Sequence, residues 1–392
     1  MDREVYVIEG KRTPFGAFGG SLSEVKATLL GTTAIKGLLE AVALDPATVN
    51  EVIIGQILPC GAGQSPARQA MRGAGIPDSA AALTINKACG SGLKSVMLGA
   101  SSIRLGDAEI VIAGGMENMS QAPFFLKKAR YGFRMGTGEI HDHMMHDALS
   151  DPDTGKLMGE IAEGGAVRSG VTREEQDQFA IRSYTLAQEA FKNGTLKNEI
   201  IPIVMNVRGK EVLIVDDEEI FRVDFDKVSS LKPAFWKNGT ITVANASSIS
   251  DGAAMLLLAS GGATKRHNLT PQARVVASAT SCLHPDYFPE APAAAILAVC
   301  ERANLKVADI DLFEINEAFA SVPLLAIKQL GIPLDKVNVN GGACAIGHPV
   351  GASGGRLALT VVRELQARKL SYGLATLCLG GGEAVAVIFE RV

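Results

Sequence analysis

The pattern of apolar and polar positions along the chain predicts buried strands that alternate with amphipathic helices. Short apolar runs rich in Val, Ile and Leu are typical of strands, and all of them are far shorter than the ~18 residues needed to span a bilayer. Strands are expected at residues 5–8, 50–58, 83–85, 108–113, 274–279, 310–315 and 372–379, and helices at residues 29–42, 173–193, 293–302 and 351–367. This alternation indicates an α/β protein built in layers.

The first and last thirds of the chain follow the same order of elements. In each, a glycine-rich turn (residues 89–92 and 347–355) opens a helix, and that helix leads to a strand closed by glycines (114–115 and 380–382). Identity between the two parts is slight, but the repeated order predicts a duplication. The charged region between them, about residues 119–249, is expected to form an inserted, more exposed domain.

Composition narrows the class of protein. Of the 392 residues, 47% are apolar and 20% are charged, which excludes intrinsic disorder. A formal net charge of −4 argues against nucleic acid as a partner. We expect no membrane segment and no leader, which makes the cytoplasm the expected location. The six cysteines form no C-x-x-C pair, and Cys60, Cys282 and Cys300 are expected to be buried apolar thiols.

Four short patterns are rejected as sites. Residues 351–355 match the G-x-S-x-G turn that carries the nucleophile of many hydrolases, but that turn needs a preceding strand and a later histidine, and His348 is the last histidine. The pattern S-x-x-K occurs twice and has no K-T-G partner. Residues 61–63 lack the third glycine of a dinucleotide-binding turn. The histidines and aspartates of residues 141–147 fit no standard zinc spacing, so we expect a polar surface or interface loop there.

Two cysteines, one histidine and one asparagine are the serious candidates for chemistry. Cys89 lies where a predicted strand runs into a helix, and a helix N-terminus favours the thiolate and can hold an oxyanion. The alternative for Cys89 is a buried structural cysteine. His348 stands among glycines that let a substrate approach, and an imidazole with a near-neutral pKa is a natural base for a thiol. Cys378 and Asn316 end predicted strands, where α/β sheets place ligands.

Longer motifs give the chain a family resemblance. Residues 86–92, 316–320, 341–351 and 378–382, together with 113–120 (AGGMENMS) and 244–254 (ANASSISDGAA), resemble the motifs of the thiolases in the same order over essentially the full length. The resemblance implies a thiolase-like fold, with duplicated α/β/α/β/α layered halves and an inserted loop domain. The implied domains are an N-terminal half at residues 1–118 plus about 250–270, a loop domain for CoA binding and tetramerisation at 119–249, and a C-terminal half at 271–392.

The resemblance also implies roles for the candidate residues. Cys89 would be the nucleophile that takes an acetyl group as a thioester, and His348 would remove its proton. Cys378 would be the acid/base that deprotonates the methyl group of a second acetyl-CoA. Asn316, through a held water, and His348 would form one oxyanion hole, and the backbone N–H groups of Cys89 and Gly380 would form the other. No metal or redox cofactor is required.

Other positions resemble the family's substrate contacts. The two basic residues Arg222 and Lys227 resemble the family's contacts with the CoA nucleotide. The alternative for this pair is a solvated charged face, because acidic residues surround the two side chains. The candidates for CoA binding are Arg222, Lys227, Ala246, Ser247, Met158 and Phe319.

Some positions resemble the mitochondrial-type short-chain thiolase in particular. Phe288 and Pro289 resemble the loop with which that subgroup accepts a 2-methyl branch. The same subgroup is activated by potassium, and the residues that resemble its ion site are Tyr184, Val243, Ala244, Ala246 and Cys344. Leu157 and Glu383 depart from the usual family pattern, and the sequence offers no physical account of Glu383.

The leading hypothesis is therefore an acetyl-CoA C-acetyltransferase activity. Two acetyl-CoA would condense reversibly to acetoacetyl-CoA and CoA through an acetyl-cysteine, with 2-methylacetoacetyl-CoA also accepted, in a homotetramer built as a dimer of dimers. One alternative is a degradative 3-ketoacyl-CoA thiolase of fatty-acid β-oxidation. Another is a non-catalytic protein that binds acyl-CoA or lipid on a thiolase scaffold, which would be expected to lack a cysteine or histidine that this chain retains.

Overall fold

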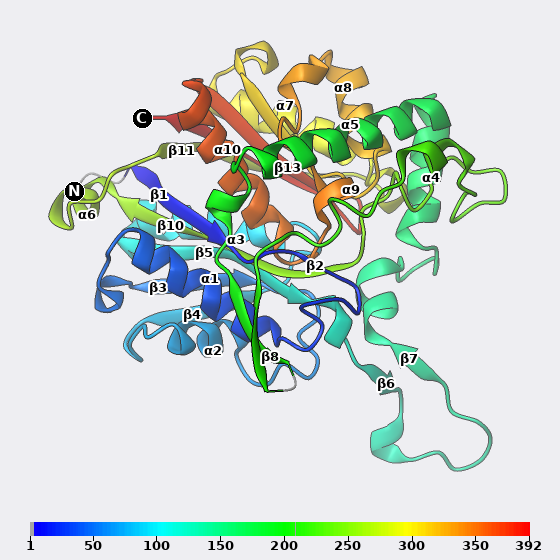
Figure 1. The fold of residues 1–392 in the computed structure, drawn as a ribbon, viewed down its shortest axis with the longest axis horizontal. Helices are drawn as coiled ribbons and strands as arrows, with labels where there is room; N and C mark the ends of the chain where they lie inside the picture. Colours follow the sequence, from blue (N-terminus) through cyan, green and yellow to red (C-terminus); the bar gives the residue numbers. More distant parts are fainter. Residues whose placement is uncertain (1–3, 208) are drawn as a thin grey trace.

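The computed structural model describes residues 4–207 and 209–392 and is built around one ten-stranded sheet (Figure 1). The strands of this sheet are β1 (Val5–Arg12), β2 (Gly16–Ala17), β3 (Glu51–Gly55), β4 (Ala81–Ile85), β5 (Ile110–Asn118), β10 (Ser250–Ser260), β11 (Ala273–Cys282), β12 (Leu312–Ile315), β13 (Tyr372–Leu379) and β14 (Glu383–Arg391). Neighbouring strands follow the order β12-β13-β14-β11-β1-β10-β5-β3-β4, and β2 pairs with β10.

The strand pairings repeat between the two halves of the sheet. In the first half β3 runs parallel to β5, which is antiparallel to β10, which is antiparallel to β1. In the second half β12 runs parallel to β13, which is antiparallel to β14, which is antiparallel to β11. The halves join where β1 and β11 place two residue pairs in register. The same pattern in the same chain order confirms the predicted duplication.

The helices are α1 (Ala27–Ala41), α2 (Pro66–Gly73), α3 (Ser91–Leu105), α4 (Met158–Arg168), α5 (Arg173–Lys192), α6 (Gly261–Arg266), α7 (Ala291–Ala303), α8 (Ser321–Leu330), α9 (Ala343–Ile346) and α10 (Ser353–Arg368). Two of them, α3 and α10, lie between the halves and bring their first turns together. Helices α3 and α10 pack against each other and each contacts strands of both halves. A Cβ on Gly354 would lie 2.1 Å from the backbone N of Leu93, and one on Gly92 would lie 2.8 Å from the backbone O of Gly351. Only glycine leaves room for this approach, so the N-terminal ends of α3 and α10 meet between the halves.

The side chains of β10 show why the strands of the first half are continuous apolar runs. Leu256 and Leu258 belong to the core cluster that also contains residues of α3, whereas Met255 and Leu257 belong to the cluster formed with α1 and α2. Because side chains alternate along a strand, β10 is buried on both faces. The outer helices α1 and α2 cover one face and the central helices cover the other.

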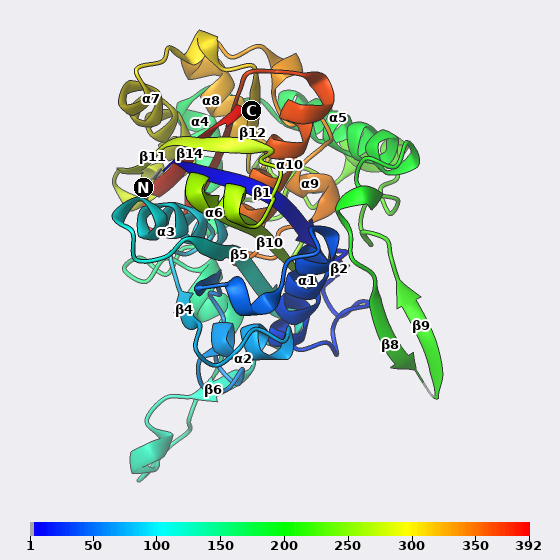
Figure 2. The same cartoon turned by 90° about the vertical axis from the view of Figure 1, so that its left-hand side faces the viewer.

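The segment between β5 and β10 carries elements that lie outside the large sheet. The hairpin of β6 (Phe124–Leu126) and β7 (Ile140–Asp142) and the hairpin of β8 (Ile203–Val207) and β9 (Lys210–Ile214) project from the body in different directions (Figures 1 and 2). Helices α4 and α5 instead contact α8. The buried Arg12 of β1 ties this segment to the sheet, because its guanidinium lies 2.6 Å from an oxygen of Asp217 and 2.9 Å from an oxygen of Glu199.

The predicted end of the strand at residues 108–113 is wrong. Strand β5 does not end at Gly114 and Gly115 but continues to Asn118. A Cβ on Gly115 would lie 1.8 Å from the backbone O of Gly351, and one on Gly114 would lie 2.0 Å from the backbone O of Ala254. These glycines are therefore required by the close approach of neighbouring backbone and do not end the strand.

The histidine-rich segment differs in part from the polar surface loop that was expected. His143 is buried, and its Nδ1 lies 2.6 Å from one carboxylate oxygen of Asp147, while the Nδ1 of His146 lies 2.6 Å from the other. These residues are part of β7 and of a short π-helix at Met145–Leu149 or lie next to them. In residues 4–207 and 209–392, no cluster of three or more His, Cys, Asp or Glu side chains could hold a metal ion.

The exposure of the remaining cysteines also differs from the prediction. Cys300 is buried as expected, but Cys60 and Cys282 are exposed. Among the described residues, no helix is both long enough and apolar enough to cross a membrane.

Candidate active site

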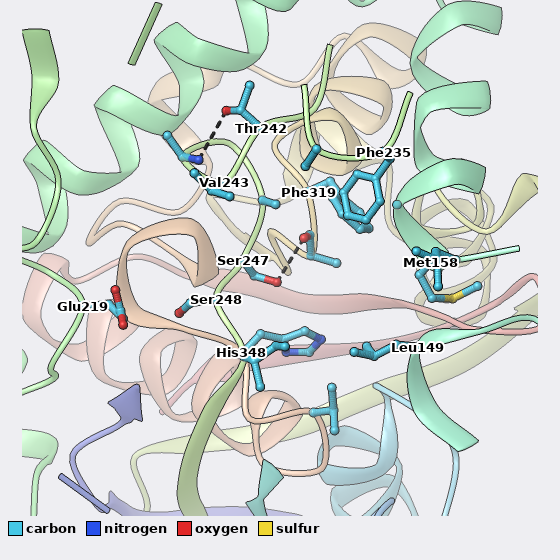
Figure 3. Close-up of a pocket in the computed structure, with 18 of the residues that line it drawn as sticks. Leu149, Met158, Glu219, Phe235, Thr242, Val243, Ser247, Ser248, Phe319 and His348 are labelled. Atoms are coloured by element: carbon cyan, nitrogen blue, oxygen red, sulfur yellow. Dashed lines mark hydrogen bonds between the residues drawn. The ribbon is translucent and has the colours of Figure 1, made fainter. Parts of the chain in front are cut away.

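A cavity of about 710 Å³ gathers residues from both halves and from the inserted segment (Figure 3). Cys89, His348, Cys378 and Gly380 line it. Asn316 lies outside this lining, buried behind His348. All six candidates for CoA binding line the same cavity: Met158, Arg222, Lys227, Ala246, Ser247 and Phe319.

Cys89 occupies a strained turn between β4 and α3. Ala88 has a φ of 44°, which residues other than glycine adopt rarely, and strain of this kind is common at functional sites. The turn is held by the Asn86 Oδ1, which accepts a hydrogen bond from the Ala88 N–H at 3.0 Å. The backbone N–H groups of Gly380 and of Cys89 itself lie near the Cys89 sulfur, where each acts to lower the pKa of the thiol. Two donors therefore converge where the reacting sulfur would be.

Burial decides the charge of Cys89. Burial raises the pKa of the Cys89 thiol to about 11, more than the N–H groups of Gly380 and Cys89 lower it, and the nearby Glu117 also acts to raise it. The helix N-terminus was expected to favour the thiolate, whereas burial raises the pKa of this thiol so that it holds its proton at neutral pH.

His348 is held by contacts at both ring nitrogens. Its Nδ1 lies 2.6 Å from the Ser353 Oγ, and its Nε2 lies 3.4 Å from the Asn316 Nδ2. Its backbone N–H donates to the backbone O of Ser248 at 3.1 Å. Burial, and after it the charge of Arg356, lowers the pKa of His348 to about 3. The expected near-neutral pKa is therefore wrong, and the ring is uncharged at neutral pH.

Asn316 contributes a buried acceptor next to His348. Its backbone N–H donates to the backbone O of Thr376 at 3.0 Å, which fixes it at the end of β12. Within the described residues its Oδ1 has no hydrogen-bond partner. A buried carbonyl oxygen without a protein partner is a natural position for an ordered water.

Cys378 lies on β13, immediately before a turn of glycines. Burial, and after it the neighbouring Cys89, raises the pKa of the Cys378 thiol well above its usual value, so this thiol is protonated at neutral pH. Gly381 and Gly382 have φ values of 87° and 84°, and a Cβ on Gly382 would lie 2.4 Å from the backbone O of Leu283. The glycines thus allow the tight turn that brings the Gly380 N–H to the Cys89 sulfur.

The two basic candidates for CoA binding are exposed and engaged with acidic neighbours. Arg222 forms ion pairs with Glu218 and with Glu219, the second at 3.0 Å. The Lys227 Nζ lies 2.7 Å from an oxygen of Asp224. Both are side chains of the cavity lining that reach into solvent, which leaves them accessible to an anionic group at the cavity mouth.

The apolar candidates form the wall next to Cys378. Phe319 packs edge-on against Phe235 at 5.9 Å between ring centroids and against Phe288 at 6.5 Å. Met158 and Ala246 pack against the cluster that contains Phe319 and Cys378. The Ser247 Oγ donates to the Ala318 backbone O at 3.0 Å, a bond drawn as a dashed line in Figure 3.

Of the residues that resemble the branched-substrate loop and the potassium site, most line the cavity and two lie outside its lining. Phe288 lines the cavity, whereas Pro289 packs against Gly165 of α4. Tyr184, Val243 and Ala244 line the cavity together with Ala246. Cys344 is buried outside the cavity lining, where its backbone N–H donates to a Glu317 carboxylate oxygen at 3.0 Å.

Three neighbours of the candidate site were not predicted as part of it. Ser353 contacts His348 although its G-x-S-x-G pattern was rejected as a nucleophile turn. Glu117 is a buried carboxylate that accepts hydrogen bonds from the N–H groups of residues 57, 58 and 351, and burial raises its pKa to about 7. Glu383 forms an ion pair with Lys87, two residues before Cys89, which supplies the physical account that the sequence lacked.

The fold and the cavity together define a duplicated α/β protein in which two thiols and one imidazole face a shared cavity between the halves. The family models "Thiolase, N-terminal domain" and "Thiolase, C-terminal domain" match residues 5–262 and 269–391. The chain belongs to the thiolase family.

Relatives with printed names agree with this assignment. The chain is 46% identical to an acetyl-CoA acetyltransferase of Cupriavidus necator, over 99% of both chains. It is 45% identical to a mitochondrial acetyl-CoA acetyltransferase of Danio rerio, over 99% of this chain and 92% of the relative. The crystal structure of the Bacillus anthracis acetyl-CoA acetyltransferase superposes with a TM-score of 0.97 at 38% identity, covering 100% of this chain and 99% of the other.

Proposed function

We propose that this protein is an acetyl-CoA C-acetyltransferase that interconverts two acetyl-CoA with acetoacetyl-CoA and CoA. The observation that carries the proposal is the meeting of Cys89, His348 and Cys378 at one cavity, which Gly380 also lines. The relatives named for this activity are 45–46% identical to the chain over nearly its full length. A thioester on Cys89 suits the reaction because exchange between thioesters is nearly isoenergetic.

In the first half-reaction, the Cys89 sulfur bonds to the acyl carbon of acetyl-CoA as its proton passes to the His348 Nε2. The carbonyl oxygen becomes an oxyanion, which the N–H groups of Cys89 and Gly380 stabilise. The C–S bond to CoA then breaks, and the departing CoA sulfur takes the proton of Cys378. The high pKa values of both thiols fit this scheme, because each starts with the proton that it must give away.

In the second half-reaction, the Cys378 thiolate removes a methyl proton from a second acetyl-CoA. The enolate oxygen is stabilised by the protonated His348 and by a water on the Asn316 Oδ1, the buried acceptor described above. The enolate carbon attacks the acetyl group on Cys89, and the released Cys89 sulfur recovers its proton from His348. All groups return to their starting protonation states, and no metal or redox cofactor enters.

The cavity supports CoA as the substrate handle. Phe319, Met158 and Ala246 form an apolar wall beside Cys378 that suits the pantetheine chain, with Ser247 next to it. Arg222 and Lys227 at the exposed rim are proposed to meet the phosphates or the nucleotide, exchanging their acidic partners for the ligand. Phe288 lies at the end of this wall, with Pro289 behind it, and these two residues are proposed to leave room for a 2-methyl branch.

Further parts of the proposal concern ions, assembly and location. Potassium is proposed to bind near Tyr184, Val243, Ala244 and Ala246, with Cys344 as a buried neighbour. A homotetramer is supported by the hairpin arm of β6 and β7, which exposes large apolar side chains that a second copy would cover: Phe124, Leu126, Tyr131, Met135 and Ile140. A reducing compartment such as the cytoplasm is consistent with six free thiols.

The proposed function is tested by steady-state thiolysis of a series of 3-ketoacyl-CoA substrates from acetoacetyl-CoA to 3-ketohexadecanoyl-CoA, with 2-methylacetoacetyl-CoA included. We expect the highest kcat/KM with acetoacetyl-CoA and turnover of the methyl compound. A preference for the long chain would favour the degradative thiolase instead. A Cys89→Ser protein that keeps full turnover would overturn the mechanism, and absence of turnover by the wild type on every substrate would favour the binding protein.

A further inference from the structure

Ser353 is a buried hydroxyl that contacts the ring of His348. Its Oγ lies 2.6 Å from the His348 Nδ1 and 3.0 Å from the backbone O of Pro349. The side chain is about 1% exposed, and it stands outside the residues that line the cavity. The G-x-S-x-G serine therefore points at the histidine and does not face a substrate.

The hydrogen-bond inventory of these groups decides which one donates. A serine hydroxyl carries one hydrogen, and a backbone carbonyl can only accept. Donation to the carbonyl four residues earlier is the common arrangement of a serine in a helix, and here that carbonyl belongs to Pro349. The lone pairs of the Ser353 Oγ are then left to accept a hydrogen from the His348 Nδ1. The Nε2 is left with a lone pair and lies 3.4 Å from the Asn316 Nδ2.

We propose that Ser353 is a positioning residue, which holds neutral His348 in the tautomer with the proton on Nδ1 and the lone pair on Nε2. This inference rests on the proposed function, because that tautomer is the one that can take the Cys89 proton. With the proton on Nε2 instead, that nitrogen would have no lone pair and could not act as a base.

The burial of His348 makes this choice of tautomer necessary. An imidazole whose pKa is lowered to about 3 is neutral at physiological pH, so it carries a single N–H whose position is set by its partners. Gly354, which follows Ser353, lets α10 approach α3, and this places the serine and its histidine beside the Cys89 turn. The same short motif thus supplies both the helix contact and the hydrogen-bond partner.

The experiment compares Ser353→Ala with Ser95→Ala as a matched control. Ser95 is also a fully buried serine near the start of a central helix, but its hydroxyl lies 2.7 Å from the backbone O of Gly92 and of Gly114 and contacts no histidine. We measure kcat, KM and melting temperature for thiolysis of acetoacetyl-CoA. We expect Ser353→Ala to lower kcat by roughly tenfold to a hundredfold, with KM changed by less than about threefold. The melting temperature of Ser95→Ala is expected to fall to a similar extent, while its kcat stays unchanged.

A second measurement uses the wild-type protein, so that it does not depend on how a variant folds. Long-range ¹H–¹⁵N correlation spectra of ¹⁵N-histidine-labelled protein, with the His348 signals identified by their loss in His348→Asn, report which ring nitrogen carries the proton. A proton on Nδ1 supports the inference, and a proton on Nε2 overturns it. Unchanged kcat in Ser353→Ala also overturns it, whereas failure of the proposed function would appear separately, as absence of turnover in the wild type.

Discussion

The contact between α3 and α10 gives the most stringent prediction, which is the effect of Gly354→Ala. The new Cβ would lie 2.1 Å from the backbone N of Leu93, about 1.3 Å short of the 3.4 Å at which ordinary contact begins. The other two near atoms are the Cβ of Leu93 and the carbonyl carbon of Gly92, so no flexible side-chain end can move aside. The first turns of the two helices must therefore separate by roughly 1 Å.

This separation has a cost in stability and a cost in activity. Overpacking of a rigid contact costs about 1–3 kcal/mol, and we expect the upper end because backbone is involved. At about 2.1 cal/mol/K of unfolding entropy per residue, 392 residues give a shift of about 1.2 °C per kcal/mol, so the melting temperature should fall by roughly 3–4 °C. The same shift moves His348, which precedes α10, away from Cys89, which precedes α3. A misplacement of ~1 Å typically costs ~10²-fold in rate, so kcat for thiolysis of acetoacetyl-CoA should fall about a hundredfold.

The matched control is Gly262→Ala in α6. The nearest atoms to a Cβ at that position are 3.8 and 3.9 Å away, so the change should leave kcat unaltered and raise stability by up to about 1 kcal/mol. Differential scanning fluorimetry and steady-state kinetics on both variants form the assay. If Gly354→Ala behaves like Gly262→Ala, the packing argument is refuted. If Gly354→Ala lowers the melting temperature but keeps kcat, the link between this contact and the site is refuted.

Two further predictions concern charge near Cys89. Because burial raises the pKa of Cys89 to about 11, the thiolate fraction of Cys89 should rise about tenfold for each pH unit from pH 7 to pH 9. The rate of its alkylation by iodoacetamide, measured by mass spectrometry of the Cys89 peptide, should rise in the same proportion. A rate that does not change with pH would instead indicate a preformed thiolate–imidazolium pair. The Lys87–Glu383 ion pair is about 28% exposed on both sides, so Glu383→Gln should lower stability by no more than about 1 kcal/mol, and the charge-swapped pair Lys87→Glu with Glu383→Lys should recover it. A double-mutant cycle by thermal denaturation measures this coupling, and a zero coupling energy would show that the pair does not tie the halves together.

Much of the fold could be predicted from the sequence because its strands are buried on both faces. A strand such as β13 reads as a continuous apolar run, and its predicted bounds at residues 372–379 are those observed. Strand β5 was cut short because Gly114 and Gly115 look like a terminus in sequence. Whether a glycine ends a strand or admits another backbone depends on a partner far away in the chain, here Gly351, which no local pattern reveals.

The candidate site was predictable in its residues but not in its electrostatics. Cys89 and His348 were found from local signals, a strand running into a helix and a glycine-rich turn. Their charge states were predicted wrongly, because the sequence shows the helix end next to Cys89 but not the desolvation that outweighs it. Ser353 was missed for a related reason. Its motif was tested only for a serine nucleophile, and its role through His348 depends on the packing of α10.

The uncharged state of the site has a consequence for the proposed reaction. With both thiols protonated and His348 neutral, the three reacting groups carry no charge that binding of an apolar acyl chain would have to desolvate. Charge develops only as the Cys89 sulfur attacks, when the new oxyanion meets the N–H groups of Cys89 and Gly380 and the proton reaches His348. Interactions that form only in the transition state lower the barrier without tightening ground-state binding. Burial that raises the pKa of the nucleophile is therefore compatible with fast acyl transfer, provided that His348 keeps its lone pair on Nε2, which is the role proposed for Ser353.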